Sequence, residues 1–205
     1  MASINFKKKE IECKIVYYGP GRSGKTTNLE YIFKSYKNYV SGEMISIKTE
    51  GDRTLFFDFL PLGIGKIKGF NIRLQLYTVP GQVQYRSTRK LVLKQVDGIV
   101  FVADSVKVRR EKNILSLKDM QANLKEYGIS IYKIPLVLQY NKRDLIDHAI
   151  PLMSVEQMEK ELNSQLQVPS FSASAMTGLG VGKTLKECLK LTIVSIRKQL
   201  KLVQR

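Results

Sequence analysis

The chain has 205 residues and a formal net charge of +16, and 43% of its residues are hydrophobic. This length and apolar content suit one compact domain spanning residues 1–205 and argue against a second domain. The basic excess predicts attraction to acidic or phosphate-rich partners, but it is shared among residues 7–9, 86–94, 107–112 and 183–205. Because the basic residues form no single continuous stripe, we expect solvated basic faces rather than a nucleic-acid surface. Peripheral contact with a membrane remains an alternative.

No segment of the sequence predicts export, membrane insertion or lipid attachment. The first residues lack the apolar run of a signal peptide, and no later stretch is long and apolar enough to cross a bilayer. Position 2 is Ala2, and the tail ends at Arg205 without a cysteine that could be prenylated. Cys13 and Cys188 lie in apolar patterns, where we expect buried thiols rather than redox or metal chemistry. The expected location is the cytoplasm.

Apolar and β-branched runs alternate with helical patterns, which is typical of a mostly parallel sheet with helices on both faces. Strands are expected over residues 11–18, 56–62, 70–79, 98–103, 135–140 and 170–172, and helices over residues 25–35, 85–95, 109–127, 155–166 and 179–202. Gly63 and Gly65 predict a hairpin between the second and third strands, so one strand should be antiparallel. Ser154 and Gln157 have capping-box spacing. The predicted fold is an α/β P-loop domain with a six-stranded sheet.

Residues 19–26 fit the pattern G-x-x-x-x-G-K-[ST] between an apolar strand and a helix. In such a loop the backbone N–H groups point at phosphate oxygens, and the helix N-terminus adds partial positive charge. Lys25 is expected to bridge the β- and γ-phosphates, and the Thr26 hydroxyl to coordinate Mg²⁺. The candidate phosphate-binding residues are Gly19, Gly21, Arg22, Ser23, Gly24, Lys25, Thr26 and Thr27. This loop predicts a nucleoside triphosphate without choosing its base.

A second motif, Asn141-Lys142-Arg143-Asp144, follows the strand expected at residues 135–140 and predicts a guanine site. The Asp144 carboxylate can only accept hydrogen bonds, and guanine offers two adjacent donors where adenine offers none. Adenine would leave the carboxylate unpaired, and a site of this kind rejects the analogue that lacks the donors by about 10⁴-fold. This disfavours a P-loop kinase or ATPase, which would bind ATP. Lys142 can lay its stem along the base, and Asn141 can tie two loops together or reach the base edge.

A later polar loop is expected to place a backbone N–H at the guanine carbonyl oxygen. Its candidate residues are Ser174, Ala175 and Met176. With this loop in place, the chain resembles the Ras-like small GTPases over nearly its whole length. Within that family it is similar to the bacterial MglA group, through residues 17–21, 52–61, 77–82 and 138–144. The resemblance implies a monomeric switch that binds GTP or GDP with Mg²⁺ and hydrolyses GTP slowly unless a GTPase-activating protein helps.

Further roles come from the resemblance alone. Similarity to the MglA group implies cell polarity or gliding motility, concentration at a cell pole, a Roadblock-type activating partner like MglB, and polarity or motility effectors. Thr54 would close over Mg²⁺ beside Thr26, and Gly81 N–H would touch the γ-phosphate. Gln82 would orient the attacking water, and Arg53 would act as an arginine finger supplied by the chain itself. The alternative for Arg53 is a solvated loop charge.

Two residues depart from the Ras-like pattern. Thr78 stands where most relatives carry an aspartate that holds Mg²⁺ through water, and Asp52 or Asp58 is expected to help instead. Met176 replaces a common lysine at a position that should read the base through its backbone. An alternative function therefore stays open, a nucleotide-gated scaffold with negligible hydrolysis and a basic docking surface, supported by Thr78 and the net charge of +16.

Overall fold

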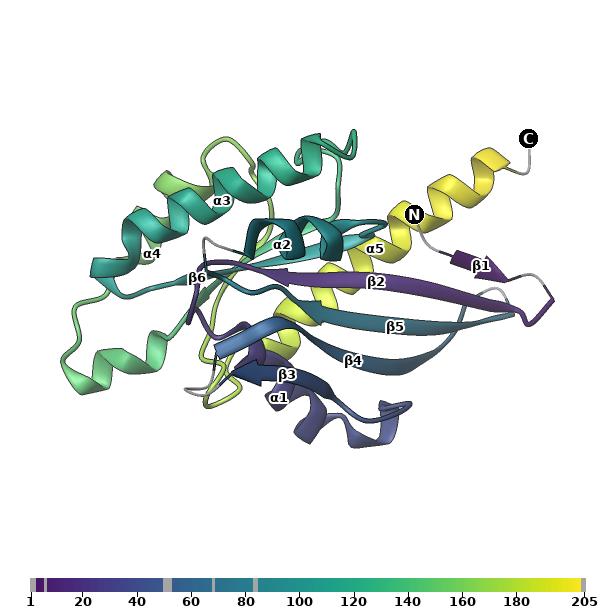
Figure 1. Cartoon of the computed structure of the whole chain (residues 1–205), viewed down its shortest axis with the longest axis horizontal. Helices are drawn as coiled ribbons and strands as arrows, with labels where there is room; N and C mark the ends of the chain where they lie inside the picture. Colours follow the sequence, from purple (N-terminus) through teal and green to yellow (C-terminus); the bar gives the residue numbers. More distant parts are fainter. Residues whose placement is uncertain (1–2, 6, 50–52, 68, 83–84, 204–205) are drawn as a thin grey trace.

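The structure is a computed structural model that describes residues 3–5, 7–49, 53–67, 69–82 and 85–203. Its centre is one sheet in the order β3-β4-β5-β2-β6-β7-β8, with β1 paired to β2 (Figure 1). The strands are β1 Ser3–Asn5, β2 Glu10–Tyr18, β3 Ile45–Thr49, β4 Arg53–Ile67, β5 Phe70–Thr78, β6 Gly98–Asp104, β7 Leu136–Asn141 and β8 Ser170–Ser172.

Five α-helices are described. They are α1 Lys25–Ser35, α2 Arg86–Leu93, α3 Arg110–Lys125, α4 Val155–Met158 and α5 Val181–Val203. The structure also describes the 3₁₀ turns η1 Lys37–Tyr39, η3 Lys107–Arg109 and η4 Arg143–His148 and the π-helical turn η5 Glu159–Asn163. Among the described helices, none has the length and apolarity that a membrane span requires.

The predicted six-stranded, mostly parallel sheet is confirmed, and two further strands extend it. β2 pairs in parallel with β5 and β6, and β6-β7-β8 continue in parallel, whereas β4 is antiparallel to β5. The added strands β1 and β3 are both antiparallel to their neighbours. The predicted turn at residues 63–66 is wrong in position, because β4 runs on to Ile67. Gly63 and Lys66 instead flank a shift in register within the β4–β5 ladder.

The predicted helix over residues 155–166 begins as expected but does not remain an α-helix. The Ser154 side chain accepts a hydrogen bond from the Gln157 backbone N–H at 3.1 Å, as its spacing predicted. After Met158 the helix widens into the π-helical turn η5. The Asn163 side chain at its end donates from Nδ2 to the Val168 carbonyl oxygen and accepts at Oδ1 from the Val168 N–H. The Ser154 half of the predicted capping box is therefore confirmed, whereas the Gln157 side chain donates to Glu161 Oε1 at 3.2 Å instead of reaching back. The widened turn was not predicted from the sequence.

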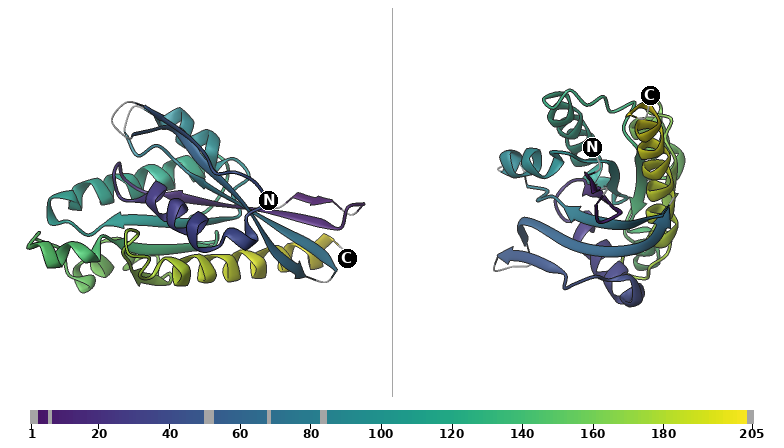
Figure 2. Two further views of the ribbon diagram at one scale, coloured as in Figure 1. Left: turned by 90° about the horizontal axis from the view of Figure 1, so that it is seen from below. Right: turned by 90° about the vertical axis from the view of Figure 1, so that its right-hand side faces the viewer.

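Side chains of β2 divide the core into two layers because successive residues of a strand face opposite sides. Ile15 and Tyr17 pack with residues of α1 and α5, and Val16 and Tyr18 pack with residues of α2, α3 and α4. Figure 2 shows α5 and α3 on opposite sides of the sheet. The two cysteines are buried and free, as expected, and burial raises the pKa of Cys188 to about 12.

The parallel strands place every candidate motif at one edge of the sheet. The phosphate loop follows the carboxyl end of β2, and Asn141 is the last residue of β7. The Ser174 loop follows β8, the strand beside β7. Open parallel sheets bind ligands at this edge, so three loops far apart in sequence meet there.

Gly98 of β6 lies directly against α5. A methyl group added at Gly98 would lie 2.2 Å from Thr192 Oγ1 and 3.3 Å from Cys188 Sγ. We expect Gly98→Ala to lower the free energy of unfolding by about 1–3 kcal/mol, because α5 must shift outward. Urea unfolding measures this loss. Gly42→Ala, whose methyl would meet only Pro61 Cγ at 3.5 Å, is the control, and equal midpoints for both variants would contradict the prediction.

Candidate functional site

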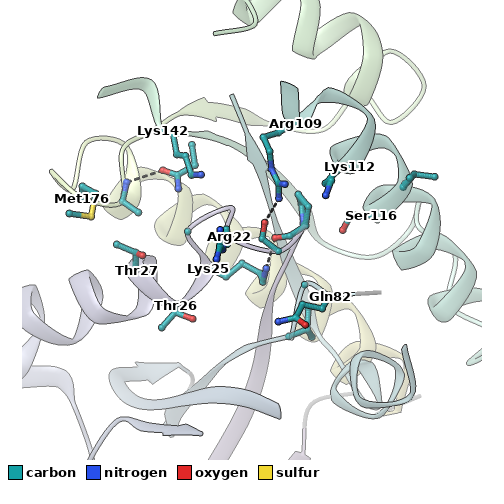
Figure 3. A pocket seen from close by; sticks show the side chains of 18 of the residues that line it. Arg22, Lys25, Thr26, Thr27, Gln82, Arg109, Lys112, Ser116, Lys142 and Met176 are labelled. Carbon is teal, nitrogen blue, oxygen red and sulfur yellow. Dashed lines mark hydrogen bonds between the residues drawn. The ribbon is translucent and has the colours of Figure 1, made fainter. Parts of the chain in front are cut away.

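A cavity of about 1110 Å³ opens at the carboxyl edge of the sheet. Figure 3 shows Lys25 near its centre, with Arg109, Lys112 and Ser116 of η3 and α3 to one side and Lys142 and Met176 to the other. The lining residues expected from the sequence are Gly21, Arg22, Gly24, Lys25, Thr26, Thr27, Gly81, Gln82, Asn141, Lys142, Asp144, Ala175 and Met176. The structure thus brings together residues from both predicted motifs and from the segment at Gly81.

Three of the expected residues, Gly19, Ser23 and Ser174, are not among those that line the cavity. Gly19 has φ +146°, and an added methyl there would lie 2.2 Å from the Val102 carbonyl oxygen, so only glycine fits. Ser23 and Ser174 are buried, and the Ser174 hydroxyl accepts from the Thr177 N–H at 3.2 Å. These contacts fix the backbone of the loops rather than presenting side chains to a ligand.

The phosphate loop curls around the Lys25 ammonium group. Gly24 precedes α1 in the left-handed region, with φ +96°, and Lys25 Nζ donates to the carbonyl oxygens of Gly19 at 2.9 Å and Pro20 at 2.8 Å. Burial lowers the pKa of Lys25 to about 7, and Arg109 and Lys142 add like charge. An anion placed in the loop would relieve this repulsion, so the site suits a chain of phosphates.

Asn141 connects the phosphate loop to the Ser174 loop. Its Nδ2 donates to the Ser23 carbonyl oxygen at 2.7 Å, and its Oδ1 accepts from the Ala175 N–H at 2.8 Å. The side chain is 1% exposed. Of the two sequence-based interpretations, the structure therefore favours a tie between loops. Asp144 and Met176 also line the cavity.

Asp104, a residue that the sequence reasoning missed, joins the two ends of the site. Its buried carboxylate bonds Lys142 Nζ at 2.7 Å and lies 3.5 Å from Arg109 Nε, while Arg109 Nη2 donates to the Gly21 carbonyl oxygen. The base motif and the phosphate loop are thus linked through one carboxylate. Its position at the carboxyl end of β6 was the signal that could have identified it.

Asp58 of β4 lies beside Thr78, the position at which the Ras-like pattern would have an aspartate. Thr26 and Thr78 both donate hydroxyl hydrogen bonds to Asp58 Oδ2, at 2.6 Å and 2.7 Å, and the Asp58 N–H donates to Thr78 Oγ1 at 2.9 Å. A hydroxyl beside a buried carboxylate is a donor set suited to a hard divalent cation. The sequence also offered Asp52, which lies outside the described residues.

Of the residues whose roles rest on the resemblance alone, Arg53 and Thr54 are described only in their backbones. Arg53 and Thr54 begin β4, where their backbones lie opposite Thr49 and Lys48 of β3. Their side chains lie outside what the structure describes, so their expected roles stay predictions. The cavity also extends between α2 and α3, where the sequence reasoning identified no site; this part is lined by Arg89, Arg109, Lys112, Leu115, Ser116 and Asp119.

Comparisons with known proteins agree with this geometry. The profile of the ADP-ribosylation factor family matches residues 1–192. Mutual gliding-motility protein MglA of Myxococcus xanthus is 53% identical over 198 residues, covering 97% of this chain and 99% of that protein. Rat Ras-related protein Rab-27B is 25% identical over 90% of this chain and 81% of its own length. ADP-ribosylation factor-like protein 2 of Arabidopsis thaliana is 28% identical, with 85% and 84% covered.

Removing the Asn141 side chain should loosen the cavity at both ends. Asn141→Ala loses two buried hydrogen bonds, each contributing about 0.5–1.5 kcal/mol, so we expect GDP to dissociate roughly 5- to 150-fold faster. Stopped-flow release of a fluorescent GDP measures the rate. Asn163→Ala is the matched control, because that amide bonds Glu159 and Val168 away from the cavity. A similar acceleration in both variants would show that general loosening, not the tie, is responsible.

Proposed function

This chain belongs to the ADP-ribosylation factor family of small GTPases, and we propose that it is a nucleotide-driven switch for cell polarity or gliding motility. As a GTPase it binds guanine nucleotides and hydrolyses GTP to GDP and phosphate. The motility role is supported by the 53% identity to the gliding-motility protein MglA across almost the full length of both chains.

The observation that carries the assignment of nucleotide-binding residues is the joining of three loops by Asn141. Because its amide holds both Ser23 and Ala175, a single ligand can be gripped at its phosphates and inspected at its base. We assign the phosphates to the N–H groups of residues 19–26 and to Lys25. We assign recognition of the guanine edge to the Asp144 carboxylate, and contact with the base plane to the methylene stem of Lys142.

We assign the chemistry to Arg53 at the start of β4 and to Gly81 and Gln82 after β5. Gln82 lines the cavity beside Gly21 and Gly81, where a water attacking the γ-phosphate could be oriented. Arg53 would stabilise the charge that builds on the transferred phosphoryl group, and Gly81 N–H would donate to one of its oxygens. Both the attacking water and the charge are then held by this chain's own residues.

Thr26 and Thr54 are the side chains assigned to Mg²⁺, with Asp58 holding its outer shell. The short bonds from Thr26 and Thr78 to Asp58 support this arrangement. Bound Mg²⁺ would neutralise negative charge on the β- and γ-phosphates. Asp58 would orient the Thr26 hydroxyl and accept hydrogen bonds from coordinated water, which is the work of the aspartate found at position 78 in most relatives.

The partner that we propose is a Roadblock-type activating protein similar to MglB, together with polarity or motility effectors. We expect a monomer that works in the cytoplasm and concentrates at a cell pole. The scaffold with negligible hydrolysis is the weaker alternative, because Asp58 places a carboxylate beside Thr78 that could take the role of the absent aspartate.

Hydrolysis should depend on Gln82 and Arg53 while GTP binding should not. We expect Gln82→Leu and Arg53→Ala to lower turnover at least about tenfold, since each removes an interaction made in the transition state, with GTP affinity nearly intact. Single-turnover phosphate release, with and without a Roadblock-type partner, measures this. Gln157→Leu and Arg110→Ala are matched controls on α4 and α3. Absence of phosphate release from the wild type even with the partner would favour the scaffold instead.

Asp58 should set the Mg²⁺ requirement. Removing an outer-shell carboxylate typically costs about 10- to 100-fold in metal affinity, so we expect Asp58→Asn to need at least about tenfold more Mg²⁺ for half-maximal GTP hydrolysis. Titration of hydrolysis against Mg²⁺ gives this value. Asp97→Asn is the control, because Asp97 accepts from the Lys14 N–H at 2.9 Å near the opposite edge of the sheet. A wild-type Mg²⁺ requirement in Asp58→Asn would contradict the assignment.

A further inference from the structure

Arg89 of α2 connects switch II to the body of the domain, where switch II denotes residues 79–82 and helix α2. Its side chain is 7% exposed. The Nη1 group donates to the carbonyl oxygens of Gln82 and, at 3.4 Å, of Pro80, while Nε donates to Asp119 Oδ2 at 2.8 Å. One guanidinium thus holds the backbone on both sides of Gly81 and ties it to α3.

Asp119 is itself fixed by two further side chains. Tyr18 donates its hydroxyl hydrogen bond to Asp119 Oδ2, and Asn123 Nδ2 donates to the same oxygen at 3.1 Å. Burial and the neighbouring carboxylate raise the pKa of Tyr18, so its hydroxyl remains a donor. Tyr18 is the last residue before the phosphate loop. The contacts therefore run from the phosphate-loop strand through α3 to the backbone of switch II.

The held segment lies directly on the phosphate loop. A methyl group added at Gly81 would be 2.2 Å from Gly21 N and 2.4 Å from Gly21 Cα, so the two backbones are in van der Waals contact. A γ-phosphate gripped by the loop and touched by the Gly81 N–H has to lie between them. At this point the two backbones touch, so we infer that switch II moves away from the loop when a γ-phosphate is placed between them.

We propose that Arg89 is a latch that holds switch II closed against the phosphate loop, and so favours GDP over GTP. The inference rests on the proposed GDP/GTP switch. GDP has no γ-phosphate and is compatible with the closed state, whereas GTP binds only the open one. The apparent dissociation constant for GTP is then the intrinsic constant divided by the open fraction. Weakening the latch enlarges that fraction and tightens GTP binding relative to GDP.

A merely structural ion pair between α2 and α3 would behave differently. Its loss would lower the stability of the domain and weaken both nucleotides alike, because neither state of switch II would be singled out. Lys90 makes such a pair, since its Nζ bonds Glu126 of α3 without reaching Pro80 or Gln82. The ratio of the two dissociation constants therefore separates a latch from general docking of the helices.

The test measures the dissociation constants of GDP and of a non-hydrolysable GTP analogue for the full chain with Mg²⁺. In Arg89→Met we expect the ratio of the GTP-analogue constant to the GDP constant to fall about fivefold or more. Asp119→Asn should shift it in the same direction by less, because Arg89 keeps its bonds to switch II. Lys90→Met, which removes a matched cation of the same helix, should leave the ratio at the wild-type value.

An unchanged ratio in Arg89→Met, or an equal shift in Lys90→Met, would overturn the latch while leaving the GTPase assignment intact, provided that wild-type protein binds both nucleotides. Wild-type protein without affinity for either would remove the switch function as well. If Arg89→Met does not fold, Asp119→Asn and Tyr18→Phe decide the question, because each weakens the anchor of Arg89 and leaves its cation in place. Wild-type ratios in both would then count against the latch.

Discussion

The whole site depends on positive charges that are kept close together out of water. The Lys25 ammonium is buried within the phosphate loop, and Arg89, Arg109 and Lys142 lie near enough to lower its pKa further. Like charges in a partly dry cavity repel strongly, and carbonyl oxygens and the three carboxylates of Asp58, Asp104 and Asp119 relieve only part of this repulsion. A polyphosphate supplies the missing negative charge, which makes ligand binding and the stability of this edge of the sheet interdependent.

The carboxylates around these cations do more than neutralise them. Asp104 holds Lys142 and approaches Arg109, so the base end and the phosphate end share one anchor. Asp58 bonds Thr26 and Thr78 from the neighbouring strand. This supports our proposal that Asp58 of β4 supplies the negative charge that position 78 of β5 lacks, because a side chain on an adjacent strand can reach the same region.

The fold and much of the site could be predicted because their signals are local. Apolar runs located the six strands of the expected sheet, and the glycine spacing of residues 19–26 placed the phosphate loop before α1, whose bounds agree with the expected helix. The strands β1 and β3 were missed, since short edge strands carry little apolar patterning. The turn of the β4–β5 hairpin was misplaced because glycine also marks irregularities inside a strand.

What the sequence by itself determined was the set of motifs, the order of elements and the preference for guanine, each of which follows from residue types at short spacing. Only the tertiary structure decided which distant residues serve the same cavity. The pairing of Asp58 with Thr26, of Asp104 with Lys142 and of Arg89 with Asp119 spans about 30 or more positions in each case. Such contacts depend on strand register and helix packing, which place side chains together without leaving a periodic trace.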